Sequence, residues 1–155
     1  MKRRQQSPAA GLKPVLRFAV VIFLFFLTIQ RASSQIDVSS TGGVPMGSYA
    51  SLSAAFDAIN AGTHTGAISI LVTGNTSEPA AGAILQASGT GSASYGSILI
   101  QPSGGAARTI SGAATAGTGL VQLNGADYVT FDGLNAGGNS LTIQNTTVSS
   151  TSGTS

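Results

Sequence analysis

The chain has 155 residues, with no cysteine, 21 glycines and few charged residues, seven of them basic and five acidic. Its formal charge of +2 is misleading, because from Gln35 onward one basic residue, Arg108, stands against five acidic residues, which gives −4. Such a segment lacks the basic surface that binds phosphate backbones, which argues against nucleic-acid binding. The absence of cysteine excludes disulfides, a lipoprotein anchor and thiolate zinc sites.

Residues 1–34 are predicted to be a Sec-type signal peptide. Basic residues precede an uncharged apolar run at residues 18–29, small residues follow it, and cleavage is expected after Ser34 or Gln35. The run is shorter than the roughly 20 apolar residues of a stable membrane span. An uncleaved signal anchor is the alternative, and twin-arginine export fits poorly because the run is too hydrophobic. The prediction is a secreted or cell-surface protein without a stable span after cleavage.

Residues 35–47 are interpreted as a lead-in, and residues 48–62 are predicted to form the one amphipathic helix. Ser48 or Ser51 is suited to the N-cap, and Gly62 is suited to the position where a left-handed residue ends a helix. Three apolar side chains share one face of this helix: Leu52, Phe56 and Ile59.

Residues 67–147 contain short apolar runs separated by turns rich in Gly, Asn, Asp and Pro. The runs read as β-strands at 67–72, 83–89, 97–102, 108–112, 119–125, 129–133 and 140–146. Nothing between them resembles a helix of ten residues, which excludes βαβ crossovers. The high Gly and Ser content is also compatible with disorder, but the regular placement of the apolar runs argues against it.

A repeat favours one arrangement of these strands. The phrase RTISG at 108–112 matches VTFDG at 129–133 at an offset of 21 residues. A β-sandwich gives no meaning to a fixed offset, whereas a solenoid stacks equivalent positions. We therefore predict an all-β, right-handed parallel β-helix of about three to four rungs, covered at its start by the helix. The expected inward side chains are Ile98, Ile100, Ile110, Val129, Phe131, Leu141 and Ile143, and amide side chains at strand ends (Gln101, Asn124, Gln144 and Asn145) are expected to bond along the stack.

The chain also resembles a known family. YASLSAAFDAIN at 49–60, AISILV at 67–72 and RTISG are similar to the N-terminal portion of pectin lyase-like right-handed parallel β-helix proteins, as are the phrases up to residue 147. The resemblance implies the fold more specifically than an activity. It also extends to large secreted bacterial surface proteins of the adhesin-like type, which end in a sorting module that does not occur among these residues.

The sequence offers few groups for catalysis. Asp127 and Asp132 are the only acidic pair close in sequence, and both are interpreted as turn residues that bond local backbone N–H groups. His64 is interpreted as an exposed loop residue without a catalytic partner. Glycosidases need two carboxyl groups about 5–9.5 Å apart, and the motifs of pectin methylesterases match no position here. We assign no catalytic, cofactor-binding or metal-binding residue and expect no cofactor.

Sugar binding usually involves exposed aromatic rings that stack on the pyranose. Tyr95 and Tyr128 are the candidates that remain after the other aromatic residues are assigned to the core or to the cap. Arg108 is a further candidate, as a partner for a sugar carboxylate, although an exposed strand residue is its simpler interpretation.

Residues 148–155 form a Ser/Thr-rich turn, interpreted as a truncation at which the solenoid is incomplete and lacks its C-terminal rungs. The leading hypothesis is a non-catalytic N-terminal segment of a secreted or surface-displayed protein, adhesin-like or structural, with weak binding of extracellular polysaccharide or cell-surface glycan. The alternative is the N-terminal fragment of a polysaccharide-active lyase, esterase or hydrolase whose catalytic residues lie elsewhere. A self-assembling extracellular fibre is a third hypothesis.

Overall fold

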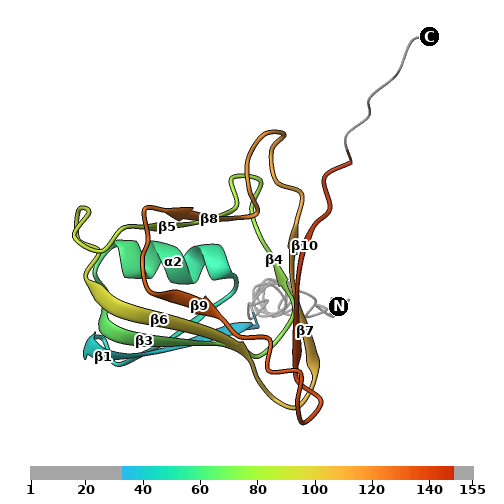
Figure 1. Ribbon diagram of the computed structural model, residues 1–155, viewed down its shortest axis with the longest axis horizontal. Coiled ribbons are helices and arrows are strands. Elements are labelled where there is room, and N and C mark those ends of the chain that lie inside the picture. The colour runs from blue at the N-terminus through green and yellow to red at the C-terminus, as the bar shows by residue number, and fades with distance from the viewer. Residues whose placement is uncertain (1–32, 149–155) are drawn as a thin grey trace, which may run out of the picture. The chain divides into compact units, whose positions relative to one another are not determined.

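The computed structural model describes residues 33–148, which contain one helix and ten strands (Figure 1). The helix is α2 (Leu52–Asn60). The strands are β1 (Ile36–Gly43), β2 (Met46–Tyr49), β3 (His64–Val72), β4 (Thr76–Ser77), β5 (Ala83–Gln86), β6 (Tyr95–Pro102), β7 (Ala107–Gly112), β8 (Val121–Asn124), β9 (Val129–Phe131) and β10 (Ser140–Asn145).

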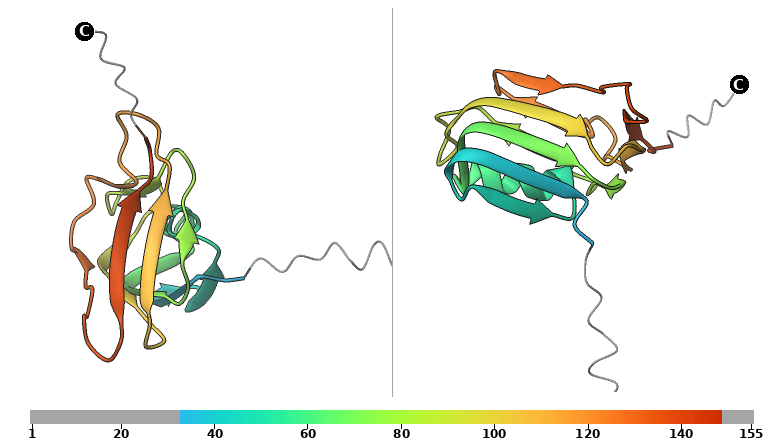
Figure 2. Two further views of the ribbon diagram at one scale, coloured as in Figure 1. Left: turned by 90° about the vertical axis from the view of Figure 1, so that its right-hand side faces the viewer. Right: turned by 90° about the horizontal axis from the view of Figure 1, so that it is seen from below.

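The largest sheet has five strands in the order β2-β1-β3-β6-β9. Strand β1 pairs antiparallel with both β2 and β3, whereas β3, β6 and β9 pair in parallel. These strands lie side by side in the right panel of Figure 2. Ile36 and Val38 of β1 point into the core and alternate with polar residues, as expected for a sheet with one buried face.

Two smaller sheets contain parallel pairs only. One has the order β10-β7-β4, and its strands lie side by side in the left panel of Figure 2. The other consists of β5 and β8. Amide side chains also join neighbouring strands, since Asn124 Nδ2 donates to Gln86 Oε1 at 2.7 Å and Gln101 Nε2 donates to Asp132 Oδ2 at 3.0 Å.

The predicted fold class, an all-β right-handed parallel β-helix, is therefore wrong. The described residues form three small sheets, the largest of them mixed, together with one helix, and they do not form a single all-parallel coil. The residues interpreted as a lead-in, 35–47, form most of the hairpin of β1 and β2 and account for the antiparallel pairs. Their alternating pattern was obscured by the Gly-rich turn in which Gly43 has φ = +69°.

The predicted offset of 21 residues is also wrong. Phe131 of β9 lies opposite Ile100, and Ile110 of β7 lies opposite Ile143. The two matching phrases belong to different sheets. Both phrases place an apolar residue between two polar residues and end in Gly, and this shared local pattern produces the similarity without any pairing between them.

The predicted inward side chains fall into three groups. Ile98, Ile100 and Ile110 are fully buried. Three others are half-buried and pack against the core: Val129, Phe131 and Leu141. Ile143 is 46% exposed, because β10 is the last strand of its sheet and nothing covers its inner face among the described residues.

Helix α2 lies within the predicted range, and Figure 1 shows it between β5 and the large sheet. Its N-cap is Ser51, whose hydroxyl accepts a hydrogen bond from Ala54 N at 3.2 Å. Gly62 follows its C-cap and has φ = +74°. The predicted apolar face is buried, with Leu52, Phe56 and Ile59 inaccessible to solvent.

No helix within residues 33–148 combines the length and the apolarity needed to cross a bilayer. The predicted signal peptide at residues 1–34 lies almost entirely outside the described residues. Of the predicted polar turn at 148–155, the description includes Val148 alone.

Thr76 is buried, with 4% of its surface exposed, and its hydroxyl has no hydrogen-bond partner among the described residues. A buried polar group without a partner costs about 1–3 kcal/mol. We expect Thr76→Val, which replaces the hydroxyl by a methyl group, to raise the free energy of unfolding by about 1 kcal/mol. Urea denaturation with an unchanged m-value measures this gain. Thr76→Ser keeps the hydroxyl and is expected to destabilise, and a Val variant less stable than the parent contradicts the prediction.

Candidate functional site

The structure does not bring the three predicted glycan contacts together. Arg108 lies in β7, in a different sheet from the two tyrosines, and its Nε donates to the carbonyl oxygen of Ser103 at 3.0 Å. Tyr95 begins β6, and Tyr128 directly precedes the neighbouring strand β9. Each residue therefore has to be considered on its own.

Tyr95 is buried, with 7% of its surface exposed, which removes it as a surface contact for a glycan. Its hydroxyl donates to the carbonyl oxygen of Gln86 at 2.5 Å, and burial raises the pKa of the phenol. If side chains of β6 alternated strictly between the two faces of the sheet, the inward position of Ile98 would place Tyr95 on the solvent-facing side. A register shift opposite Gly66, where Tyr95 pairs with Gly66 but Ser97 pairs with Ala67, turns the ring inward.

Tyr128 is the exposed aromatic residue of the predicted set, with 80% of its surface accessible. Its backbone has φ = +56°, a left-handed conformation that is unfavourable for a bulky side chain. The conformation is held in place because the Tyr128 carbonyl oxygen accepts a hydrogen bond from Ile98 N at 3.0 Å. The backbone of Tyr128 is thus hydrogen-bonded to β6, while the ring is exposed to solvent.

Asp127 and Asp132 do not form a catalytic pair. Asp132 Oδ1 accepts from Leu134 N at 2.9 Å, which is the local turn bond that the sequence predicts, and its Oδ2 accepts from Gln101. The hydrogen bond from Leu134 N and that from Gln101 lower the pKa of this carboxyl group. Asp132 is therefore kept ionised as a turn acceptor, while Asp127 is exposed in the turn before β9.

The interpretation of His64 as an exposed loop residue is wrong, because the residue is fully buried in β3. It shares the inward side of the strand with Ile68 and Ile70, so the alternation that identified these two also indicates its burial. His64 Nδ1 lies 2.7 Å from the carbonyl oxygen of Val44, which only accepts, so this nitrogen carries the proton. The Tyr49 hydroxyl, 2.6 Å away, then donates to Nε2.

Ser40 completes this buried cluster without becoming a nucleophile. Its Oγ lies 3.3 Å from His64 Nδ1, the nitrogen already bound to the Val44 carbonyl. The Ser40 hydroxyl is within 2.9 Å of the Gly42 carbonyl oxygen and within 2.8 Å of the Val44 carbonyl oxygen, which are the acceptors for its proton. The Ser40 hydroxyl is bound to carbonyl oxygens, and His64 beside it is inaccessible to solvent. We therefore interpret this cluster as structural: it holds the β1–β2 hairpin against β3.

Glu78 was not singled out from the sequence, and it has a defined structural role. Its buried carboxylate lies at the N-terminus of α2, where Oε1 accepts from Leu52 N at 3.0 Å and Oε2 accepts from Ser53 N at 2.8 Å. The first N–H groups of a helix have no partner inside the helix and carry partial positive charge. Glu78 supplies the missing acceptors from a segment about 25 residues further along the chain.

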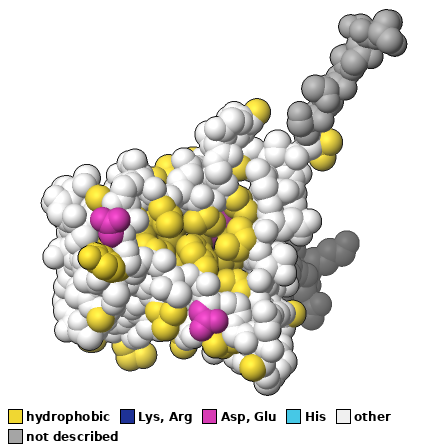
Figure 3. Space-filling view, in the orientation of Figure 1, with side chains coloured by type: hydrophobic (Ala, Val, Ile, Leu, Met, Phe, Trp, Pro, Cys, Tyr) yellow, Lys and Arg dark blue, Asp and Glu magenta, His cyan; other side chains and the backbone are white. Residues whose placement is uncertain are grey.

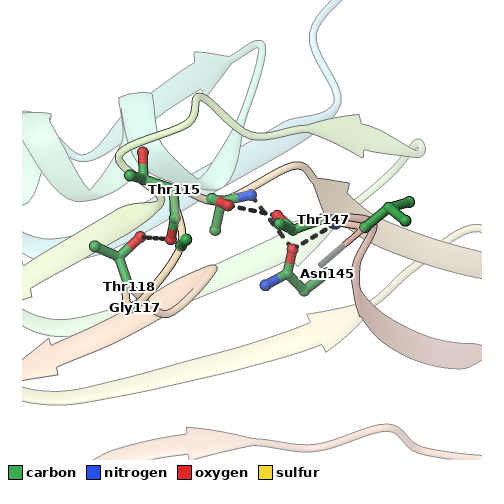
Figure 4. A pocket seen from close by; sticks show the side chains of 8 residues that line it. Thr115, Gly117, Thr118, Asn145 and Thr147 are labelled. Atoms are coloured by element: carbon green, nitrogen blue, oxygen red, sulfur yellow. Dashed lines mark hydrogen bonds between the residues drawn. The ribbon is translucent and has the colours of Figure 1, made fainter. Parts of the chain in front are cut away.

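One open pocket lies beside the end of β10, with a volume of about 510 Å³ (Figure 4). It is lined by Ala114, Thr115, Ala116, Gly117, Thr118, Asn145, Thr147 and Val148. Its polar groups bond to one another: Asn145 Oδ1 accepts from Ala114 N at 3.3 Å and from Thr147 N at 3.0 Å, and Thr118 Oγ1 donates to the Thr115 carbonyl at 2.7 Å. With no ionisable side chain in its lining, the pocket provides no side-chain acid or base.

No group of three or more metal-ligating side chains occurs among residues 33–148. Comparison of the chain with protein-family models, with curated proteins and with solved structures gave no match. The likeness to pectin lyase-like proteins thus remains a prediction from short sequence phrases.

Proposed function

We propose that the chain is a non-catalytic, structural module of a secreted or surface-displayed protein, adhesin-like in character, which contacts extracellular glycans through Tyr128. Export through the Sec-type signal at residues 1–34 is part of this proposal. It draws on the signal-like pattern of the sequence, on the use of the buried ionisable groups within the fold and on the chemistry of the outer surface.

The ionisable groups that resemble catalytic groups have structural partners instead. Glu78 binds the start of α2, His64 bonds to Tyr49 and Val44, and Asp132 closes its own turn. These arrangements support a module that binds rather than reacts, because the groups are committed to contacts that hold the fold.

Where β1, β3 and β6 cross it, the outer face of the large sheet presents serine and threonine hydroxyls beside apolar side chains and carries few charges. Ser39 pairs with Ser69, and Ala67 of the same strand pairs with Ser97, in an open groove of about 420 Å³. Hydroxyl groups of this kind donate to and accept from sugar hydroxyls. The formal charge of −4 from Gln35 onward disfavours acidic polysaccharides, so a neutral glycan is the class that we propose.

The observation that carries the proposal is Tyr128, a highly exposed ring on a left-handed backbone. A bulky residue in this conformation costs about 1–3 kcal/mol, and such outliers concentrate at binding sites. Glycine at this position would remove the strain, so a tyrosine there indicates a use for the ring. Stacking on a sugar face is the interaction that an exposed aromatic ring offers.

We expect the full chain to bind a soluble neutral β-glucan more tightly than polygalacturonate at low salt, and Tyr128→Ala to weaken that binding about fivefold. This factor corresponds to about 1 kcal/mol of stacking. Affinity electrophoresis in gels containing each polysaccharide measures the effect. Tyr128→Phe keeps the ring and should bind like the parent, and Met46→Ala is the matched control, because Met46 is a 75% exposed apolar residue of β2.

Equal migration of the parent and the Tyr128→Ala variant in every gel would contradict the proposal. Release of reducing ends or unsaturated sugars from either polysaccharide would favour the enzyme alternative instead. Tyr128→Gly separates function from folding, since it should lose binding while keeping or increasing stability through relief of the positive φ.

A further inference from the structure

Arg108 is the only basic residue among residues 33–148, and no acidic residue of this range is paired with it. All five acidic residues of the chain lie in the same range, and three of them accept hydrogen bonds elsewhere: Asp37, Glu78 and Asp132. On the face that Figure 3 shows, acidic side chains of the described residues are visible and basic ones are not. Arg108 is half-buried, and charged groups drawn out of water are normally paired. It is therefore a positive charge whose counter-ion does not come from these residues.

The guanidinium group of Arg108 is held in place by the turn between β6 and β7. Its Nε donates to the Ser103 carbonyl oxygen at 3.0 Å. The group also lies against the backbone of Gly104, where an added Cβ would stand 2.7 Å from Nη2. The N–H donors on Nη1 and Nη2 have no partner among the described residues. A planar fork of donors is thus positioned and left free.

The turn itself does not depend on Arg108. Ser103 N donates to the Val72 carbonyl oxygen at 2.9 Å, and Gly105 N donates to Asn139 Oδ1 at 3.0 Å. These bonds tie the turn to the end of β3 and to the residue before β10, so a ligand that binds beside it has little left to order. One N–H donor is enough for the Ser103 carbonyl, so holding the turn does not explain a complete guanidinium group.

We propose that Arg108 binds one oxyanion, a carboxylate or a sulfate ester, on an otherwise neutral glycan. This ligand class rests on the proposed function of the chain. The fork of a guanidinium group matches two oxygens of either anion. The formal charge of −4 from Gln35 onward repels a polymer that is charged on every sugar. The ligand is therefore a glycan that carries isolated acidic groups.

The test uses the full chain and three forms of one soluble β-glucan: the neutral polymer, the same polymer sparsely oxidised to uronic acid, and the same polymer sparsely sulfated. Affinity electrophoresis at low salt should show about fivefold tighter binding of the acidic forms than of the neutral form, as expected for a partly exposed ion pair. Arg108→Gln should abolish this preference and leave binding of the neutral form unchanged. Tighter binding of one acidic form alone identifies the group as carboxylate or as sulfate.

Arg31→Gln is the matched control, because it removes the same charge outside the described residues and should retain the preference. Gly104→Ala keeps the charge of Arg108 but should reduce the preference, because the new Cβ would displace Nη2. Circular dichroism checks the folding of this variant, since Gly104 has φ = +83°. An equal loss of preference in the Arg31→Gln and Arg108→Gln variants overturns the proposal.

A second measurement depends neither on the polymer nor on Tyr128. In proton–nitrogen NMR spectra of the full chain, the Nε–H signal of Arg108 should shift in a saturable way with sodium glucuronate or with a glucose sulfate ester. Glucose, and sodium chloride at equal ionic strength, should leave it unmoved. A signal that responds to neither anion, or that responds equally to sodium chloride, overturns the site. Tyr128→Ala should weaken binding of all three polymers alike, so failure of the proposed function and failure of the Arg108 site give different results.

Discussion

Phe56→Ala is expected to lower the free energy of unfolding by about 3–5 kcal/mol, the usual cost of truncating a buried phenylalanine. Phe56 is the largest fully buried side chain among the described residues, and it stands on the face of α2 that packs into the core. Small domains have only about 5–15 kcal/mol of stability, so a loss of this size leaves a substantial unfolded fraction. Removal of the ring leaves a cavity that the surrounding strands cannot fill without moving.

Urea denaturation followed by far-ultraviolet circular dichroism measures this loss as a lower midpoint. Phe56→Leu retains much of the volume and should fall between the alanine variant and the parent. Asp57→Ala, at the exposed neighbouring position of the same helix, is the control and should change the midpoint little. If Phe56→Ala lowers the free energy of unfolding by less than about 1 kcal/mol, helix α2 is not anchored in the core as described.

Glu78→Ala is the second change with a large expected effect, a loss of about 3 kcal/mol or more. The substitution removes two hydrogen bonds to a charged acceptor, at 3.0 Å from Leu52 N and 2.8 Å from Ser53 N. Bonds to charged groups contribute about 1.5–3 kcal/mol each. Both N–H groups lie at the positive end of the helix, which adds to the loss when the carboxylate is removed.

Thermal or urea unfolding measures the total loss, and hydrogen exchange at the amides of Leu52 and Ser53 locates it. Glu78→Gln should cost less than alanine, because it keeps one acceptor oxygen for a helix N–H group. It should still destabilise, because its new amide NH₂ group faces the other helix N–H group. Ser51→Ala removes the ordinary N-cap, worth about 1 kcal/mol, and provides the scale. A Glu78→Ala variant that loses no more than Ser51→Ala would show that water replaces the carboxylate.

The local structure of this chain was largely predictable, whereas the arrangement of the strands was not. The spacing of Leu52, Phe56 and Ile59 located the helix, and the apolar runs coincide with β3, β6, β7 and β10. Strand neighbours are chosen by packing between distant residues, and that information is absent from a short phrase. Matching RTISG to VTFDG therefore aligned two strands of different sheets.

Individual side chains were misplaced for the same reason. A single-residue register shift moved Tyr95 from the surface to the core, and sequence periodicity alone does not reveal such a shift. His64 and Glu78 were missed because polar residues near turns are usually exposed. Their burial depends on partners far along the chain, since Tyr49 lies 15 residues before His64 and Leu52 lies 26 residues before Glu78.

The spacing of the parallel pairs also governs the order in which the strands can pair as the chain folds. Ile98 pairs with Ile68, 30 residues earlier, and Val121 pairs with Ala83, 38 residues earlier. A chain that emerges N-terminus first therefore has no partner for the free edge of β3 until Tyr95–Pro102 has followed it. Closing such loops precedes any gain from the contacts and slows folding. Assembly is then vectorial, because each later strand pairs with the edge of a strand about three places earlier in the chain: β6 with β3, β8 with β5, and β9 with β6.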